Sequence, residues 1–401
     1  MALKIKMSKI GILDVIKFAT LHKTREKIIA KHPANPIKAD YPINNLAKTL
    51  HPDAQDLVID EIIEHIGADA KTYILKSADN KPCAYFRAGQ YLSVLMTIGD
   101  SLVTRPYSIS SSPKWALEGK YAITVRNNPE GFAAKFIIDE WEKGDHVTVS
   151  APEGTFYYDA LRDNEEIVAI AGGSGITPFL SMAYAIRDGI ENFNLTIIFG
   201  SKTEEAILFK SELDKISAEC NKVKVIHVLS DEKKEGYEHG LITVDLIKKY
   251  APYNSSIFIC GSESMYNFVM PEVEKIGLDK KYVRCELLGV TKNVTSCKGY
   301  PENIPATFNI KVKQGFEEYN ITANSDEPVL VALERAGINA PSRCRSGECG
   351  FCRSKLLSGE VFCPEENEYR RFADIQYGYI HPCAAFAISD LELEVPGSYL
   401  G

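Results

Sequence analysis

The sequence predicts a multidomain protein in which an antiparallel β-barrel is followed by a doubly wound α/β domain and a small C-terminal β-domain. Three observations lead to this fold class. The chain has 401 residues, enough for two to four domains of ordinary size. Short β-rich runs separated by Gly, Pro and Asn fill residues 68–160, and strand–helix alternation follows over 166–290. Cysteines then crowd into one loop of the segment 306–401.

The individual elements follow from local periodicity. Between 68 and 160 we expect barrel strands and one helix over 133–141. Between 166 and 290 we expect buried parallel strands with helices between them. The expected strands are 91–96, 121–126 and 146–150 in the barrel, 167–171, 195–200, 223–229 and 256–260 in the α/β domain, and 307–313 and 318–323 near the C-terminus. The expected domains are 1–65, 66–162, 163–297 and 305–401.

Residues 1–65 differ in composition from the remainder. The first forty residues carry nine Lys and Arg but only three Asp and Glu, although the whole chain has a net charge of −8. Helical periodicity over 10–30 and again over 52–65 predicts a helical N-terminal extension. We expect it to pack on the core, and the alternative is a docking surface for a partner.

Composition excludes several classes of protein. With 45% hydrophobic and 25% charged residues, the chain is neither disordered nor collagen-like. The negative charge argues against a nucleic-acid partner. We find no apolar run of about 18 residues that predicts a transmembrane segment, and no signal peptide. Ten cysteines in a large chain without an export signal favour a reducing, cytoplasmic location.

The strongest motif is a set of four cysteines near the C-terminus. Cys344, Cys349 and Cys352 are followed about thirty residues later by Cys383. This C-x4-C-x2-C…C spacing is typical of a plant-type [2Fe–2S] cluster. The alternative is a zinc site, but such sites usually have two C-x2–4-C pairs. Cys363 falls outside the spacing, and we interpret it as a buried thiol.

A flavin site is indicated by the run Arg105-Pro106-Tyr107-Ser108. The arginine can pair with a flavin phosphate. The tyrosine ring can lie against the isoalloxazine, and the serine hydroxyl can reach the region of flavin N5. The alternative is a polar strand of the barrel, because so short a motif also occurs by chance.

A nucleotide site is indicated by a glycine-rich turn after the first α/β strand. Backbone N–H groups of such a turn can bind a pyrophosphate, and a threonine hydroxyl adds a donor. The alternative is a plain tight turn. Ser201 and Lys202 end a later strand, where Lys202 could meet a 2′-phosphate of NADPH or be a solvated charge, whereas Asp231 would suit a free ribose hydroxyl. The turn contains Gly172, Gly173, Gly175, Thr177 and Pro178.

Residues 306–401 resemble the plant-type ferredoxin domain, including His381-Pro-Cys383-Ala, and this implies a β-grasp fold. The runs 86–91 and 130–135 resemble segments of the ferredoxin–NADP reductase-like flavoproteins. The second resemblance implies FAD, with FMN as the alternative. It places the flavin pyrophosphate at the turn formed by Gly131, Phe132, Ala133 and Ala134, where the family usually has Ser or Thr.

The same resemblance suggests roles for residues near the reacting atoms. Cys260 and Gly261 would lie near the nicotinamide, with a buried strand cysteine as the alternative reading of Cys260. Glu286 would lie near the flavin edge. Tyr107, Ser108, Cys260 and Glu286 are therefore the expected catalytic residues.

Taken together, the motifs predict an NAD(P)H-dependent reductase that resembles the reductase components of multicomponent oxygenases. Electrons would pass from NAD(P)H, with NADH favoured, through flavin to the cluster and on to a protein acceptor. That acceptor could be an oxygenase, a corrinoid protein or another redox enzyme. The alternative is a non-autonomous electron-transfer subunit of a larger complex.

Overall fold

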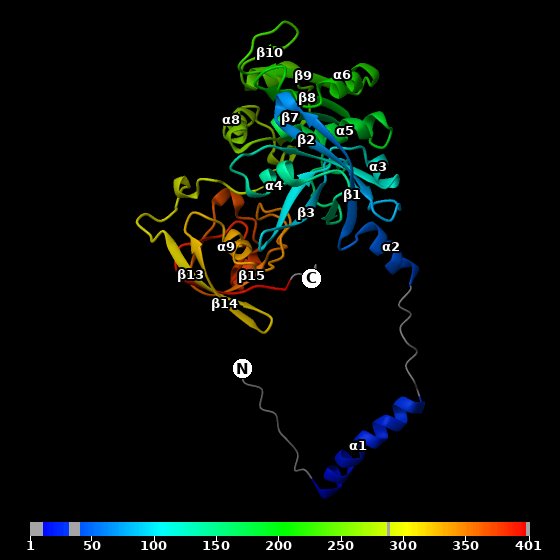
Figure 1. The fold of residues 1–401 in the computed structure, drawn as a ribbon, viewed down its shortest axis with the longest axis vertical. Coiled ribbons are helices and arrows are strands. Elements are labelled where there is room, and N and C mark those ends of the chain that lie inside the picture. The colour runs from blue at the N-terminus through cyan, green and yellow to red at the C-terminus, as the bar shows by residue number, and fades with distance from the viewer. Residues whose placement is uncertain (1–10, 32–40, 287–288, 398–401) are drawn as a thin grey trace. The chain divides into compact units, whose positions relative to one another are not determined.

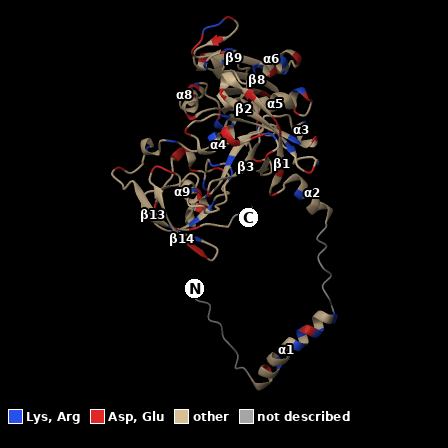
Figure 2. Ribbon diagram, in the orientation of Figure 1, with Lys and Arg blue, Asp and Glu red and all other residues tan. Residues whose placement is uncertain are grey.

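The computed structural model describes residues 11–31, 41–286 and 289–397 (Figure 1). The chain forms two units, Met1–Ala47 and Lys48–Gly401. The first unit contains α1 (Ile12–Lys31), which buries none of its residues, and the start of α2 (Pro42–Leu50). Figure 2 shows Lys and Arg distributed along α1. In the described ranges no helix combines the length and the apolar character needed to cross a membrane.

The prediction of a helix over residues 52–65 is wrong. α2 ends at Leu50, and β1 (Gln55–His65) is an 11-residue strand that pairs with β2 (Ala70–Ser77). Leu57 and Ile59 alternate inward and are buried, and a β-branched run of this kind favours a strand. Because β1 is part of the barrel sheet, the expected domain boundary at residue 65 would cut through that sheet.

The second unit begins with a six-stranded antiparallel sheet. Its order is β4-β3-β6-β1-β2-β5. Ile109, just after β4, forms an isolated bridge with Ile123 of β5 and brings the two edges together. The enclosed core contains Tyr73, Phe86 and Tyr121. The further elements are β3 (Tyr91–Ile98), β4 (Ser101–Ser108), α3 (Pro113–Leu117), β5 (Lys120–Arg126), α4 (Phe132–Glu140) and β6 (His146–Val149).

A parallel sheet follows, in the order β10-β9-β8-β7-β11-β12. Helices α5 and α6 contribute to the hydrophobic cluster on one face, and α8 contributes to the cluster on the other. Ligands of such sheets bind at the carboxyl ends of the strands where the strand order reverses, here between β7 and β11. The strands are β7 (Glu166–Gly172), β8 (Asn194–Ser201), β9 (Val223–Leu229), β10 (Glu238–His239), β11 (Ser256–Cys260) and β12 (Val283–Glu286). The helices are α5 (Thr177–Arg187), α6 (Lys210–Glu219), α7 (Val244–Tyr250) and α8 (Glu263–Glu274).

The C-terminal domain is a mixed five-stranded sheet packed on one helix, as in a β-grasp fold. The order is β14-β13-β19-β15-β17, and only the β13–β19 pair is parallel. Helix α9 places Val329, Ala332 and Leu333 in the domain core. The elements are β13 (Thr307–Gln314), β14 (Glu317–Asn324), α9 (Val329–Arg335), β15 (Ser354–Ser358), β16 (Val361–Phe362), α10 (Phe372–Gln376), β17 (Tyr379–Ile380), β18 (Phe386–Ala387) and β19 (Leu391–Glu394).

Candidate functional site

The four predicted cluster cysteines come together as two pairs. The backbone N–H of Cys349 lies 3.3 Å from Cys344 Sγ, and Cys352 Sγ lies 3.4 Å from Cys383 Sγ. A hydrogen bond from the Cys349 thiol and backbone N–H donors lower the pKa of Cys344. Among the described residues, no group of three or more His, Cys, Asp and Glu side chains is arranged so that it could hold a metal ion. Two pairs of cysteines are the ligand set of a centre with two irons, with two cysteines on each iron.

Backbone N–H groups of the loop around these cysteines donate to the cysteine sulfurs, and the loop has no room for a side chain at Gly347. Ser346 N–H donates to Cys344 Sγ and Phe351 N–H to Cys349 Sγ, each at 3.5 Å. Gly347 has φ 86°, and a Cβ there would lie 2.6 Å from the Asn367 carbonyl oxygen. His381 is buried, with Nδ1 2.6 Å from the Gly347 carbonyl and Nε2 without a partner. This donor set fits a [2Fe–2S] cluster, whose sulfurs accept hydrogen bonds.

Cys363 does not join the four cysteines. It is half-buried rather than buried, its Sγ lies 3.6 Å from the Asn367 carbonyl oxygen, and burial raises its pKa to about 12. The thiol packs against the group of buried residues that contains Cys352 and Cys383.

A cavity of about 930 Å³, here called the nucleotide cavity, lies between the barrel and the parallel sheet. Its size is that of a cofactor pocket. No carboxylate is among its lining residues, which include the cations Arg126, Lys202 and Lys292. Of the predicted site residues it gathers Pro106, Tyr107, Ala134, Gly172, Gly173, Ser201, Lys202 and Gly261. Residues Arg105, Ser108, Gly131, Phe132, Ala133, Gly175, Thr177, Pro178, Asp231, Cys260 and Glu286 are outside this lining.

The glycine-rich turn closes tightly on its neighbours. A Cβ at Gly175 would lie 2.2 Å from the Cys260 carbonyl oxygen, and a Cβ at Gly172 would lie 2.3 Å from Met265 Sδ. Thr177 Oγ1 donates to the Ser174 carbonyl at 3.0 Å, so its hydroxyl is used inside the turn. Thr177 and Pro178 begin α5 and are buried. The turn therefore needs glycine to keep β7 and β11 in contact.

The later strands place the remaining nucleotide residues at the same edge of the sheet. Cys260 ends β11 and is buried, and burial raises its thiol pKa. Ser201 Oγ is buried without a partner beside Lys202. Asp231 N–H donates to the Lys202 carbonyl at 3.0 Å, while its carboxylate accepts from Ser230 Oγ at 2.6 Å.

The residues of the expected flavin motif lie in different surroundings. Tyr107 lines the nucleotide cavity, and burial raises its pKa. Arg105 instead contacts Glu334 of the C-terminal domain, with Nη1 3.5 Å from Oε1. In the turn after β5, Gly131 caps α4, Phe132 is exposed and Ala133 is buried. A side chain larger than alanine at position 133 would not fit without rearrangement of the core.

Ser108 and Glu286 form a buried contact between the two domains. Ser108 Oγ lies 3.1 Å from Glu286 Oε2. Burial raises the pKa of Glu286 to about 8, although the hydrogen bond from Ser108 opposes this shift. The Tyr266 hydroxyl lies 2.7 Å from the carbonyl oxygen of Ile259 and 2.6 Å from that of Glu286, and so ties together the ends of β11 and β12.

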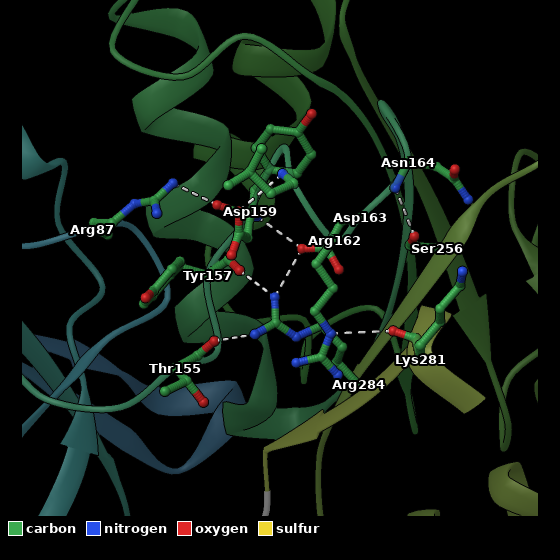
Figure 3. Close-up of polar contacts among 12 residues, drawn as sticks. Arg87, Thr155, Tyr157, Asp159, Arg162, Asp163, Asn164, Ser256, Lys281 and Arg284 are labelled. Atoms are coloured by element: carbon green, nitrogen blue, oxygen red, sulfur yellow. Dashed lines mark hydrogen bonds and ion pairs between the residues drawn. The ribbon is translucent and has the colours of Figure 1, made fainter. Parts of the chain in front are cut away.

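The end of β12 is fixed by a second buried network (Figure 3). Arg284 Nη1 lies 2.8 Å from Asp163 Oδ2, and both side chains are almost fully enclosed. The same guanidinium donates to the carbonyls of Tyr157 and Thr155. These contacts anchor the loop after the barrel to the strand that carries Glu286.

A second cavity of about 630 Å³, here called the cluster cavity, connects this edge to the cysteine loop. Its lining includes Gly154, Glu286, Cys344 and Cys349. The expected flavin edge and two expected cluster ligands therefore share one cavity.

Several residues here were not singled out from the sequence. Glu153 pairs with Arg343, and Glu334 pairs with both Arg105 and Arg345. In the sequence, Arg343 and Arg345 flank Cys344. Their position beside a predicted cluster ligand is the signal by which both arginines could have been found. The sequence shows Arg126 only as a cation at the end of a strand. In the structure its guanidinium lies beside Gly173, where an added Cβ would be 2.8 Å from Nη1.

Comparisons with known proteins match three segments of the chain. Family models match residues 58–158 (oxidoreductase FAD-binding domain), 169–270 (oxidoreductase NAD-binding domain) and 313–387 (2Fe-2S iron-sulfur cluster binding domain). A glycine betaine monooxygenase reductase subunit from Chromohalobacter salexigens is 25% identical, covering 81% of this chain and 91% of its own. The ferredoxin reductase component of a 3-ketosteroid-9-alpha-monooxygenase from Mycolicibacterium smegmatis is 26% identical, covering 84% and 95%. The solved structure of a phthalate dioxygenase reductase has the same fold, with a TM-score of 0.61, 23% identity and coverage of 86% and 98%.

The fold and the three matched domains define an iron–sulfur flavoprotein oxidoreductase. The chain contains an FAD-binding, an NAD-binding and a 2Fe-2S cluster binding domain in this order, and it is similar to the reductase components of monooxygenase systems. It is an electron-transfer reductase that carries electrons from NAD(P)H through FAD to the cluster and on to a partner redox protein.

Proposed function

We propose that electrons leave the flavin beside Glu286, cross to the cluster at Cys344 and Cys349, and then reach an oxygenase. The observation that carries this proposal is the cluster cavity, which Glu286 and both cysteines line. Short, fixed separations between carriers are what a chain of single-electron steps requires. The oxygenase acceptor is supported by the relatives, which are named as components of monooxygenase systems. A corrinoid protein or another redox enzyme is the alternative acceptor.

In the flavin site, Arg105 holds a phosphate, Tyr107 lies against the ring system and the N–H groups from Gly131 to Ala134 meet the pyrophosphate. When bound, FAD takes up two electrons together and passes them on singly. Ser108 lies at the reacting edge and is oriented by Glu286. At neutral pH the Glu286 carboxyl carries the proton that the Ser108–Glu286 pair shares. The raised pKa of Glu286 supports this assignment.

In the nucleotide site, the N–H groups of Gly172, Gly173 and Gly175 bind the pyrophosphate of NAD(P)H. Thr177 and Pro178 fix the start of α5 behind this turn. Cys260 and Gly261 lie at the nicotinamide end and exclude water from it. Ser201, Lys202 and Asp231 surround the adenosine ribose, with Asp231 accepting from a ribose hydroxyl of NADH.

In the cluster site, Cys344 and Cys349 would hold one iron, and Cys352 and Cys383 would hold the other. Their pairing supports this assignment. A cluster held there would supply one-electron transfer. Backbone N–H groups of Ser346 and Phe351 stabilise the bound thiolates. We also propose a cytoplasmic location, supported by ten cysteines that are all free.

The second candidate function is a non-autonomous subunit of a larger redox complex. The observation that favours it is α1, which buries none of its residues and has Lys and Arg along its length (Figure 2). Turnover by the isolated chain separates the two functions. An autonomous reductase oxidises NAD(P)H continuously with ferricyanide or cytochrome c as acceptor and elutes alone on gel filtration. A chain that turns over only when a partner is added would overturn the proposal.

A further inference from the structure

Among the described residues, two ion pairs join the barrel to the C-terminal domain. Glu153, in the loop after β6, contacts Arg343 of the cysteine loop. Arg105 of β4 has its Nη1 3.5 Å from Oε1 of Glu334 in α9. Both carboxylates are largely enclosed, with the Glu153 side chain 13% exposed and the Glu334 side chain 5% exposed. Each domain therefore supplies one cation and one carboxylate to the interface.

This arrangement of charges favours a single position of the C-terminal domain on the barrel. If the domain shifted so that the partners were exchanged, Arg343 would face Arg105, and Glu334 would face Glu153. Like charges that face each other in an enclosed interface are costly, so complementary charges fix the register of two surfaces. The two ion pairs thus select one docked position and oppose the shifted one.

Apolar packing does not fix this position in the same way. The barrel segment and the parallel sheet share a hydrophobic cluster, to which Ala68 and Ala88 contribute from the barrel side. Of the hydrophobic clusters formed by the described residues, none contains side chains of both the barrel and the C-terminal domain. A cavity of about 450 Å³ lies between them instead, lined by residues of β3 and β4 and by residues 339–342. The ion pairs are therefore the contacts that set the register.

Both ion pairs act on the same part of the cysteine loop. Arg343 directly precedes Cys344 in the chain, and Arg345 directly follows it. Arg345 contacts Glu334, so the carboxylate that pairs with the barrel also holds the loop. Cys344 lines the cluster cavity together with Glu286. A shift of either ion pair would therefore move an expected iron ligand relative to the expected flavin edge.

We propose that Glu153 and Glu334 are positioning residues for electron transfer from the flavin to the cluster. Their ion pairs with Arg343 and Arg105 hold the cysteine loop at one separation from the flavin edge. Neither carboxylate touches the reacting groups or exchanges an electron or a proton with them. The inference rests on the proposed function, in which electrons cross the cluster cavity. Transfer between two fixed carriers is fast only when their separation and orientation are maintained.

The test measures how fast reduced flavin passes an electron to the cluster in protein that contains FAD and the cluster. A pulse of photogenerated reductant reduces the flavin without NADH, so hydride transfer does not limit the rate, and visible absorption follows both cofactors. Glu153→Gln and Glu334→Gln should each slow the transfer about tenfold, because the loop then loses its fixed position. Glu327→Gln is the matched control, since Glu327 pairs with Arg335 within the C-terminal domain and should leave the rate unchanged.

The direction of the change separates positioning from a simple effect of charge. Glu153→Gln and Glu334→Gln each remove a negative charge from the region of the cluster. That removal favours the reduced cluster, which is the more negative state, and would speed the transfer if charge alone mattered. Slower transfer in protein with intact flavin and cluster absorption therefore indicates a change of position. Unchanged or faster transfer in either variant overturns the proposal.

Amide hydrogen exchange gives a second readout, which needs no electron flow. Residues 339–342 line the cavity between the two domains and should exchange faster in Glu153→Gln and Glu334→Gln, because local opening exposes their amides. Exchange equal to that of the wild type in both variants contradicts the proposal, and Glu327→Gln should show no increase. If pulse-reduced flavin never reduces the cluster in the wild type, the proposed function itself fails. If wild-type transfer occurs and neither variant slows it, only the positioning role fails.

Discussion

Ser108 Oγ and Glu286 Oε2 lie 3.1 Å apart and connect the barrel to the last strand of the parallel sheet. The two residues are 178 positions apart in the chain. The hydroxyl is supplied by β4, whereas the carboxyl is supplied by β12. Around this contact lie the nucleotide cavity, which Tyr107 lines, and the cluster cavity, which Glu286 lines. The contact thus lies between residues that line the two cavities, Tyr107 on one side and Glu286 on the other.

The burial of Glu286 predicts a specific dependence of stability on pH. The pKa of this carboxyl is about 8 in the folded chain, against a reference value of 4.5. Between these values the unfolded chain binds fewer protons, so the free energy of unfolding falls as the pH rises and levels off above about 8. Glu286→Gln should remove this part of the slope. Urea unfolding of the wild type and variant between about pH 5 and pH 9 measures it.

The matched control for this experiment is Glu272→Gln. Glu272 contacts Lys275, and its pKa is lowered rather than raised, so it should not change the slope in this interval. Equal slopes for wild type and Glu286→Gln would show that Glu286 ionises normally in the folded protein.

Loss of one cluster ligand should separate two activities. Cys344→Ser should abolish reduction of a protein acceptor such as cytochrome c, because the path from the flavin then lacks its last carrier. Reduction of a small dye by NAD(P)H should continue, because the flavin can be reached directly. Steady-state rates with both acceptors test this. Cys363→Ser is the control and should retain both activities, and survival of both in Cys344→Ser would contradict a serial route.

The ion pair of Arg284 and Asp163 should contribute strongly to stability. Asp163→Ala leaves a buried guanidinium without its carboxylate, and breaking a buried pair in this way costs about 3–5 kcal/mol. Denaturant unfolding measures the loss. Asp139→Ala breaks the exposed pair with Lys135 and should cost less than about 1 kcal/mol. Similar losses for the two variants would show that the Arg284 network does not anchor β12.

The glycine-rich turn predicts a defect in nucleotide binding. In Gly175→Ala the new Cβ would lie 2.2 Å from the Cys260 carbonyl oxygen, so the turn must move away from β11. We expect KM for NAD(P)H to rise about tenfold, equivalent to about 1.4 kcal/mol. Gly397→Ala, which has open space around its Cβ position, is the control. An unchanged KM in Gly175→Ala would mean that the turn does not bind the nucleotide.

The sequence was most informative where chemistry constrains spacing. The intervals between Cys344, Cys349, Cys352 and Cys383 predicted both the cluster and its domain, because iron ligation requires those residues at those separations. The glycines after β7 likewise predicted a tight turn at the carboxyl end of that strand, and the structure has such a turn there. Both patterns lie within short stretches of the sequence, so they can be found in a single sequence without a structure.

Contacts between distant elements could not be predicted in the same way. The turn of Arg105 toward Glu334 depends on how the C-terminal domain meets β4, and a single motif contains no such information. The strand Gln55–His65 was mistaken for a helix because its Leu, Val and Ile residues fit either period over so short a run. The pairing of this segment with β2 and β6 shows that it is a strand.

NAD(P)H, FAD and the [2Fe–2S] cluster should form one serial path in this chain. An anaerobic titration of the purified protein with NADH, and separately with NADPH, followed in the visible spectrum, tests this path. We expect flavin bands and a broad cluster absorption, both bleached by a low concentration of one nucleotide, with NADH the expected donor. Flavin that bleaches while the cluster absorption stays unchanged would contradict it.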